Sequence, residues 1–126
     1  MDFNYNFGDP ISIKDIELYE ARLNVKFPEQ VKEFYSQING LSVDSPALEV
    51  YNLDKVFVRN GLLYFGRFDN QYEVAFKFDK INMANQWDIV NPQNSYCITH
   101  TMASFWSNKI QVWLKNRREV WNEEKY

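Results

Sequence analysis

Apolar residues recur at helical spacing near the start of the chain, where they predict a first amphipathic helix. Ser12 is a favourable N-cap residue, because its hydroxyl accepts a hydrogen bond from a free amide of the first turn, and Asp15 adds a negative charge there. The apolar stripe of this helix comprises Ile13, Ile16 and Leu23, with Tyr19 beside it and Glu20 within it. One face should therefore lie on a core while the opposite face meets solvent.

A second helix is predicted to follow almost at once. Pro28 suits the first helical position, and Asn39-Gly40 supplies a left-handed stop. The apolar positions of this helix are Val31, Phe34, Tyr35 and Ile38. Because the link at residues 24–27 is short, the two helices should form a tight corner.

Strand patterns fill the middle of the chain. Residues 62–68 form a continuous apolar run, which is typical of a strand buried on both faces, and residues 72–78 alternate apolar and polar positions. Asp69-Asn70 lies between them, so the two segments predict a hairpin. Further strands are predicted at residues 48–53 and 87–90, and at residues 96 to 99 or 100. Residues 42–46 are predicted to be a loop, 54–60 a short helical or extended link, and 1–11 a surface arm or a short edge strand.

A last helix is predicted to begin after Thr101, which is another good N-cap residue. Its apolar stripe follows the 3.6-residue period through Phe105, Trp106, Ile110, Trp113 and Leu114, continues at Arg117 and Trp121, and ends among Lys115, Arg117 and Arg118. With helices at both ends and strands between, we expect one domain over residues 1–126 with an α+β fold. It should contain an N-terminal helical pair, a central antiparallel sheet of about four to six strands and a C-terminal helix packed on one side.

Composition narrows the class of protein. The chain has 126 residues, of which 45% are hydrophobic and 17% aromatic, enough for a well-packed core. Cys97 is the single cysteine, which excludes an intramolecular disulfide and favours a reducing, cytoplasmic location. Neither a basic start followed by an apolar block nor a long apolar run is present, so we expect neither export nor membrane insertion. The formal charge of −3 argues against nucleic-acid binding.

Candidate catalytic residues are few. Cys97 and His100 are three residues apart in a predicted strand, where side chains point to opposite faces, so we do not expect a thiol dyad. One histidine and one cysteine without clustered acids do not predict a zinc site, and no glycine-rich phosphate loop is present. We therefore expect no cofactor, no metal and no enzymatic activity, with a small hydrolase using paired carboxylates as a remote alternative.

Both ends of the chain carry a family resemblance. An amphipathic helix that begins Ile-x-x-Ile-Glu, the dipeptide Phe27-Pro28 and the ending Asn39-Gly40 resemble the SUKH superfamily, although that family usually has Leu-Pro at the dipeptide. A closing strand followed by Ala-Ser-Phe and a helix with Trp113-Leu114 is similar to its C-terminal segment. The superfamily includes fungal cell-wall-assembly regulators and many bacterial toxin-immunity proteins. The resemblance implies an α+β fold and a protein-binding function.

Acidic residues are in surplus among the predicted strands, and with two aromatic residues they form the candidate partner-binding set. This set comprises Asp44, Glu49, Asp69, Tyr72, Glu73, Trp87 and Asp88. Such a face would steer a basic partner and pair with its Lys and Arg side chains, with Trp87 or Tyr72 as an anchor. Together with the resemblance, it predicts an immunity protein, a monomer or weak dimer, that blocks a basic toxin domain such as a nuclease. A regulatory adaptor for an endogenous protein is the alternative.

Overall fold

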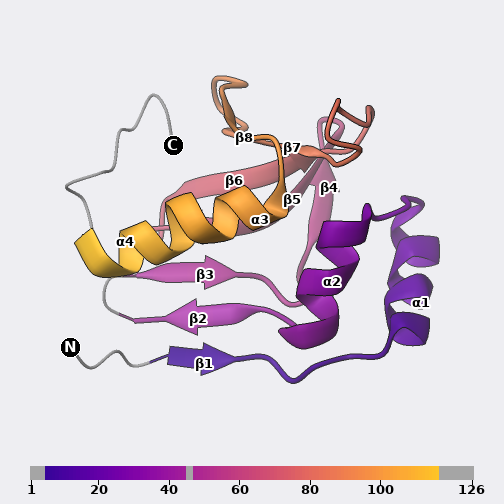
Figure 1. The fold of residues 1–126 in the computed structure, drawn as a ribbon, viewed down its shortest axis with the longest axis horizontal. Coiled ribbons are helices and arrows are strands. Elements are labelled where there is room, and N and C mark those ends of the chain that lie inside the picture. Colours follow the sequence, from indigo (N-terminus) through magenta and orange to yellow (C-terminus); the bar gives the residue numbers. More distant parts are fainter. Residues whose placement is uncertain (1–4, 45–46, 117–126) are drawn as a thin grey trace.

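The computed structural model describes residues 5–44 and 47–116 (Figure 1). Their helical elements are α1 (Ile13–Leu23), α2 (Glu29–Gln37), α3 (Met102–Phe105), a π-helical turn η1 (Trp106–Ile110) and α4 (Gln111–Asn116). Their strands are β1 (Tyr5–Phe7), β2 (Leu41–Val43), β3 (Leu48–Val50), β4 (Phe57–Arg59), β5 (Leu62–Phe68), β6 (Tyr72–Lys77), β7 (Asp88–Val90) and β8 (Cys97–Thr99). The fold is α+β, as predicted.

One antiparallel sheet organises the molecule. Its strands follow the order β1-β2-β3-β5-β6-β7-β8, and β4 pairs with the part of β5 that β3 leaves free. The helix that runs from α3 to α4 crosses one face of the sheet, while α1 and α2 stand beside one end of it (Figure 1). The described residues contribute eight strands to this sheet, more than the four to six expected, because two segments predicted as irregular are paired.

The two N-terminal helices confirm the capping signals closely. The hydroxyl of Ser12 accepts a hydrogen bond from the amide of Asp15 at 3.1 Å. Helix α2 begins at Glu29, one residue later than predicted, so Pro28 is its N-cap and not its first helical residue. The helix ends at Gln37, and Gly40 follows with φ of 96°. A Cβ at Gly40 would lie 2.7 Å from the amide nitrogen of Asn52, so both the backbone conformation and the close contact require glycine.

One prediction about an irregular segment was wrong, and a second, for residues 54–60, is confirmed in its extended alternative. Residues 42–46 were expected to form a loop, yet Leu41 and Val43 are buried and lie in β2, which pairs with both β1 and β3. Residues 54–60 contain β4, and Phe57 stacks on Tyr64 of β5 with ring centroids 4.9 Å apart. Each strand has only three residues, too few for a periodic pattern, and is ordered by its neighbours in the sheet.

The predicted hairpin is confirmed and lies at the centre of the sheet. Strands β5 and β6 pair around a turn in which Asp69 and Asn70 both have positive φ, and the register shifts at Gly66. Phe65 and Phe76 stack across this pair with ring centroids 3.9 Å apart. Phe65 also contacts Phe105 of α3. The hairpin therefore anchors the core between the sheet and the C-terminal helix.

The C-terminal helix begins as predicted but does not keep a 3.6-residue period. The hydroxyl of Thr101 accepts a hydrogen bond from the amide of Ser104 at 3.0 Å. The buried residues are Met102, Phe105, Ile110 and Trp113, so a spacing of five separates Phe105 from Ile110. The π-helical turn η1 spans this interval and keeps both residues on the core side. Arg117, Arg118 and Trp121 lie outside the described residues.

No helix among residues 5–44 and 47–116 is long and apolar enough to cross a membrane.

Candidate functional site

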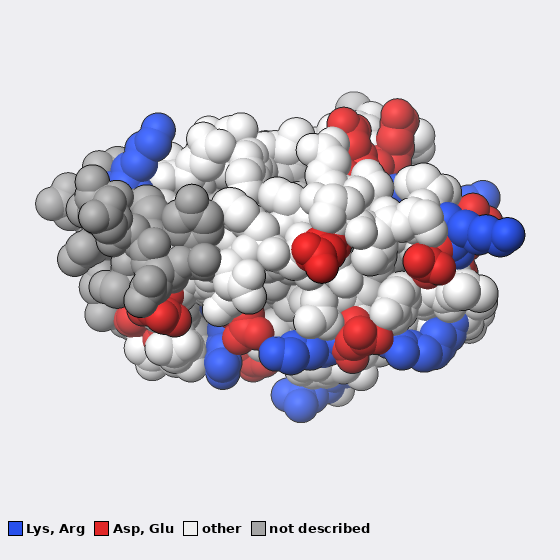
Figure 2. Space-filling view, turned by 90° about the horizontal axis from the view of Figure 1, so that it is seen from below, with Lys and Arg blue, Asp and Glu red and all other residues white. Residues whose placement is uncertain are grey.

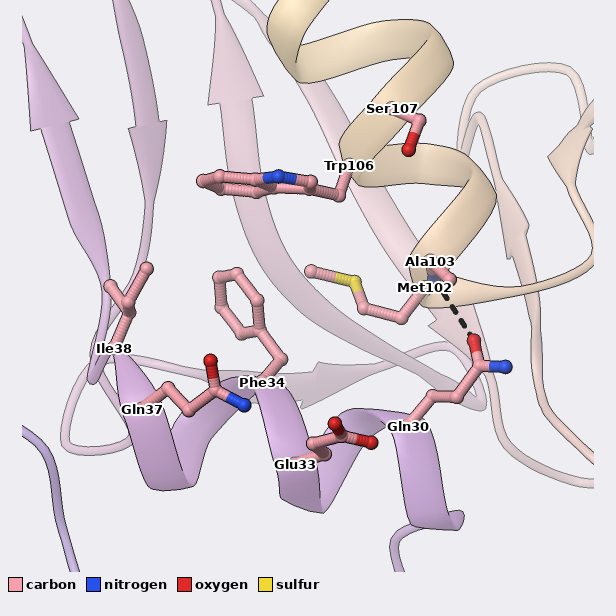
Figure 3. A pocket seen from close by; sticks show the side chains of 9 residues that line it. All are labelled: Gln30, Glu33, Phe34, Gln37, Ile38, Met102, Ala103, Trp106 and Ser107. Carbon is pink, nitrogen blue, oxygen red and sulfur yellow. Dashed lines mark hydrogen bonds between the residues drawn. The ribbon is translucent and has the colours of Figure 1, made fainter.

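A groove lies between α2 and the start of the C-terminal helix, and it has a volume of about 320 Å³ (Figure 3). Phe34 of α2 and Trp106 of η1 contact each other in it with ring centroids 5.9 Å apart, and Met102 lies beside the two rings. Both rings are only partly buried. The lining residues are Gln30, Glu33, Phe34, Gln37, Ile38, Met102, Ala103, Trp106 and Ser107. The floor of the groove is therefore apolar and includes two accessible aromatic rings.

Hydrogen bonds fix the two walls of the groove relative to each other. The side-chain oxygen of Gln30 in α2 accepts a hydrogen bond from the amide of Ala103 in α3 at 3.0 Å (Figure 3). The amide of Gln30 donates in turn to the side chain of Gln86 at 3.2 Å, and Gln86 is itself buried in the loop before β7. These hydrogen bonds join three segments that are distant in sequence at one end of the groove. The width of the groove is therefore fixed before any ligand binds.

The rim of the groove is polar and carries one formal charge. Glu33 and Gln37 project from the exposed side of α2, and Ser107 lies on the opposite wall (Figure 3). Within the part of the chain that the structure describes, no ion pair or hydrogen bond engages the carboxylate of Glu33. This carboxylate is therefore available to a cationic group of a ligand.

Sequence reasoning missed this groove, since it assigned both rings to the core. Trp106 was expected to lie on the buried stripe of the last helix, but it is only partly buried and packs at the edge of the core. The π-helical turn shifts the phase of the helix, so Phe105 and Ile110 occupy the core while Trp106 borders the groove. Trp106, Ile110 and Trp113 fit the helical period as well as Phe105 does, so the spacing of apolar residues holds no signal for the groove.

Part of the predicted acidic set lies on the outward face of the sheet, where basic residues neutralise it. Glu49 of β3 is opposite Arg67 of β5, which is opposite Glu73 of β6, so these side chains form one row across three strands. Glu49 forms ion pairs of 3.5 Å with both Arg67 and Lys55. Two acids and two bases therefore share this region, and the charge expected to attract a partner is locally balanced.

Three other members of the set lie at the end of the sheet formed by the β2–β3 and β5–β6 connections. Asp44 follows β2, and Asp69 and Tyr72 flank the tight turn of the hairpin. The amide of Asp69 donates to the carbonyl of Ala47 at 2.8 Å, which joins the two connections. The structure thus brings Asp44, Asp69 and Tyr72 to one end of the molecule.

The last two members of the set lie elsewhere. Trp87 is 3% exposed and packs edge-to-face on Phe27 at 5.7 Å, so its ring belongs to the core and is not a surface anchor. Asp88 lies opposite Lys77, at the far end of β6 from Glu73. The seven residues therefore do not form one continuous face. Figure 2 shows acidic and basic side chains interleaved on one side of the molecule, without a field of a single sign there.

Asp88, Cys97 and His100 meet at the edge formed by β7 and β8. His100 Nδ1 lies 2.8 Å from Asp88 Oδ1 and 3.6 Å from Cys97 Sγ. Cys97 and His100 were expected to point to opposite faces, and this prediction was wrong. Strand β8 ends at Thr99, and the His100 side chain lies on the same side as Cys97. The same ring nitrogen faces both partners, so this is not the arrangement of a catalytic triad, in which the two ring nitrogens serve different groups.

The environment of this cluster changes the acidity of two of its groups. Burial acts to raise the pKa of Asp88, but hydrogen bonds from His100 and Asn82 outweigh it and hold that pKa below its usual value. Burial and the neighbouring Asp88 carboxylate raise the pKa of the Cys97 thiol, although Lys77 opposes them. The thiol is therefore a poor nucleophile at neutral pH, and the site does not resemble an activated cysteine.

Comparison with known proteins identifies one family. The sequence model of the SMI1 / KNR4 family (SUKH-1) matches residues 10–107, which include α1, α2, all strands from β2 to β8 and the start of the C-terminal helix. The groove lies wholly within the matched range. A search of curated proteins finds no match.

Proposed function

The chain belongs to the SMI1 / KNR4 family (SUKH-1), and on this basis we propose that it is a non-enzymatic protein-binding domain that neutralises a toxin by stoichiometric binding. The superfamily includes both toxin-immunity proteins and regulatory proteins, and both kinds act by contact with another protein. The observation that supports the proposal is the apolar groove between α2 and η1, with Phe34 and Trp106 partly exposed along it. Aromatic residues in a preformed depression are typical anchors of protein interfaces.

The chemistry of the groove favours binding over catalysis. Glu33 is the one carboxylate among its lining residues, which include neither a histidine nor a cysteine. Acid–base hydrolysis by carboxylates needs two such groups with different roles, and nucleophilic catalysis needs an activated Ser, Cys or Lys beside a base. The groove thus offers contact area and one negative charge.

These features indicate what the partner presents. An apolar side chain would pack on the accessible faces of Phe34 and Trp106, and an adjacent Lys or Arg would reach Glu33 on the rim. The formal charge of −3 adds long-range attraction for a basic toxin domain, because opposite net charges raise the rate of encounter. Asp44 and Asp69 contribute to that attraction from the end of the sheet.

Co-expression tests this function directly. The reading frames that neighbour the gene are searched for a toxin domain, which is expressed alone and together with the chain while cell growth is followed. Neutralisation predicts that growth is restored and that the two proteins purify as one complex of fixed stoichiometry. If the toxin still kills the cells and no complex forms, the immunity role is excluded and an endogenous partner, as for a regulatory adaptor, becomes the function to pursue.

A further inference from the structure

A second candidate site lies at the edge of the sheet, outside the groove. Asp88 of β7, Cys97 of β8 and His100 after it each offer one potential ligand atom, and these atoms all lie within 4.8 Å of one another. A carboxylate oxygen, a thiolate and an imidazole nitrogen are the three ligand types that zinc binds in proteins. We propose that Asp88, Cys97 and His100 bind a divalent transition-metal ion such as Zn²⁺, with a fourth coordination position open to water.

The spacing of the Cys97 and His100 ligand atoms agrees with tetrahedral coordination. Zinc lies about 2.3 Å from sulfur and about 2.0 to 2.1 Å from nitrogen, so the two ligands of a tetrahedral site are roughly 3.5 Å apart. Cys97 Sγ and His100 Nδ1 are 3.6 Å apart. His100 Nδ1 and Asp88 Oδ1 are 2.8 Å apart and must separate to roughly 3.3 Å to bind the ion. A small rotation of the two side chains achieves this without a change in the backbone.

A neighbouring amide holds two of the ligands in place. Asn82 donates one side-chain hydrogen bond to Asp88 Oδ1 at 2.8 Å and another to the carbonyl of His100 at 2.7 Å. Its side-chain oxygen accepts from the amides of Ala84 and Gln86, which orders the loop that carries it. Metal-binding carboxylates are commonly oriented by such second hydrogen bonds, and their loss weakens metal affinity.

The surroundings leave room for the ion and its water. Asp88 and Asn82 border a depression of about 350 Å³ next to the cluster, and the His100 side chain is 73% exposed. When Nδ1 binds the ion, the ring proton moves to Nε2 and meets solvent. Lys77 and Lys80 line the same depression and oppose a cation, while the carboxylate of Asp88 and the thiolate of Cys97 supply two negative charges to offset them.

Cobalt is a suitable probe, since Co²⁺ occupies zinc sites and its spectrum reports the ligands. The full-length chain is freed of metal with a chelator and titrated with Co²⁺. We expect one equivalent to bind, with visible bands of tetrahedral cobalt and a near-ultraviolet thiolate-to-cobalt band, all abolished by Zn²⁺. Affinity should rise with pH above neutrality, because binding displaces the proton of Cys97, whose thiol faces Asp88, His100 and Lys77.

Variants decide whether these three residues are the ligands. Cys97→Ser should remove the thiolate band, and Asp88→Asn and His100→Gln should each weaken Co²⁺ binding at least about tenfold, as loss of a ligand costs no less than loss of a second-shell partner. Met83→Leu is the matched control, since this exposed thioether lines the same depression. Thermal unfolding confirms that each variant folds. Absence of the thiolate band in the unsubstituted chain, or equal affinity in Cys97→Ser, would overturn the proposal.

This proposal and the toxin-binding proposal fail separately. None of the three proposed ligands lines the groove. Metal titration uses the chain alone, whereas neutralisation is measured with the toxin.

Discussion

Glu20 shows how one side chain connects two helices. It lies within the apolar stripe of α1, where a charge looks misplaced in the sequence. In the structure its carboxylate accepts a hydrogen bond of 2.6 Å from the amide of Phe27, in the link between α1 and α2. It also forms an ion pair of 3.6 Å with Lys32 of α2, and its side chain is only 11% exposed. The charge therefore stabilises the helical corner.

Replacement of Glu20 tests this role. Glu20→Ala leaves the amide of the buried Phe27 without its partner, so we expect the free energy of unfolding to fall by about 1–3 kcal/mol. Glu20→Gln keeps an acceptor oxygen and should lose less. Glu17→Ala, on the exposed side of the same helix, is the control and should change stability by less than about 0.5 kcal/mol. Urea denaturation measures all three. Equal losses for Glu20→Ala and Glu17→Ala would show that the Phe27 bond contributes nothing.

Asp88 gives the domain a pH dependence of known sign. Its pKa in the folded protein lies below the usual value, so the unfolded chain binds more protons as pH falls. The stabilisation is thus complete above the ordinary aspartate pKa and is lost as pH decreases through the folded pKa. We expect Asp88→Asn to reduce the loss of stability between pH 5 and pH 3, measured by denaturation with a chelator present. Parallel pH profiles for the two proteins would contradict this.

The π-helical turn is the element that creates the groove wall. It accommodates one residue more than an α-helical turn between Phe105 and Ile110, and thereby keeps both in the core while Trp106 borders the groove. Two deletions test this relation. Removal of exposed Asn108 would leave Phe105 and Ile110 four positions apart, which an α-helix also places on one face. We expect this deletion to keep the fold and its helical circular dichroism.

Deletion of Gln111 is the control for the same helix. It shortens the interval between Ile110 and Trp113, which are both buried, from three positions to two and so turns one of them away from the core. This variant should unfold at a markedly lower temperature than the variant without Asn108. Similar losses for both deletions would show that the π-helical turn does not serve to align the two core residues.

The elements that sequence predicted well are those that are specified locally. Ser12 and Thr101 cap helices through hydrogen bonds to residues three positions away, so the pattern is complete within one turn. The hairpin of β5 and β6 is likewise marked by its own alternation and turn. Strand β2 was missed and β4 was left open because three residues hold no period, and only their pairing with neighbouring strands makes them extended.

The groove could not be predicted for a related reason. Phe34 and Trp106 are apolar residues at helical spacing, and nothing in such a pattern distinguishes a ring in the core from a ring at the edge of it. Their position depends on how α2 and η1 pack, and on the Gln30 hydrogen bond that fixes this packing. The acidic set does not form one face, because its members lie on different strands and connections. Its charge is also partly balanced, since Arg67 and Lys55 pair with Glu49.

At the scale of the whole molecule, α2 and the start of the C-terminal helix pack against the sheet and leave a groove between them. Introduction of a positive charge on the groove wall tests the proposal that this surface binds a toxin. Ala103 is exposed there, so Ala103→Arg would obstruct the groove and repel a basic partner. Leu18→Arg introduces the same side chain at a position of α1 that is 67% exposed and lies outside the groove.

Calorimetric titration of the toxin domain identified by co-expression into these two variants and the unsubstituted chain is the most direct measurement. We expect Leu18→Arg to bind as the unsubstituted chain does, and Ala103→Arg to bind at least about thirtyfold more weakly, because substitutions at the centre of an interface cost about 2 kcal/mol or more. Equal affinity of Ala103→Arg and Leu18→Arg for the toxin would contradict the assignment of the groove as the binding surface.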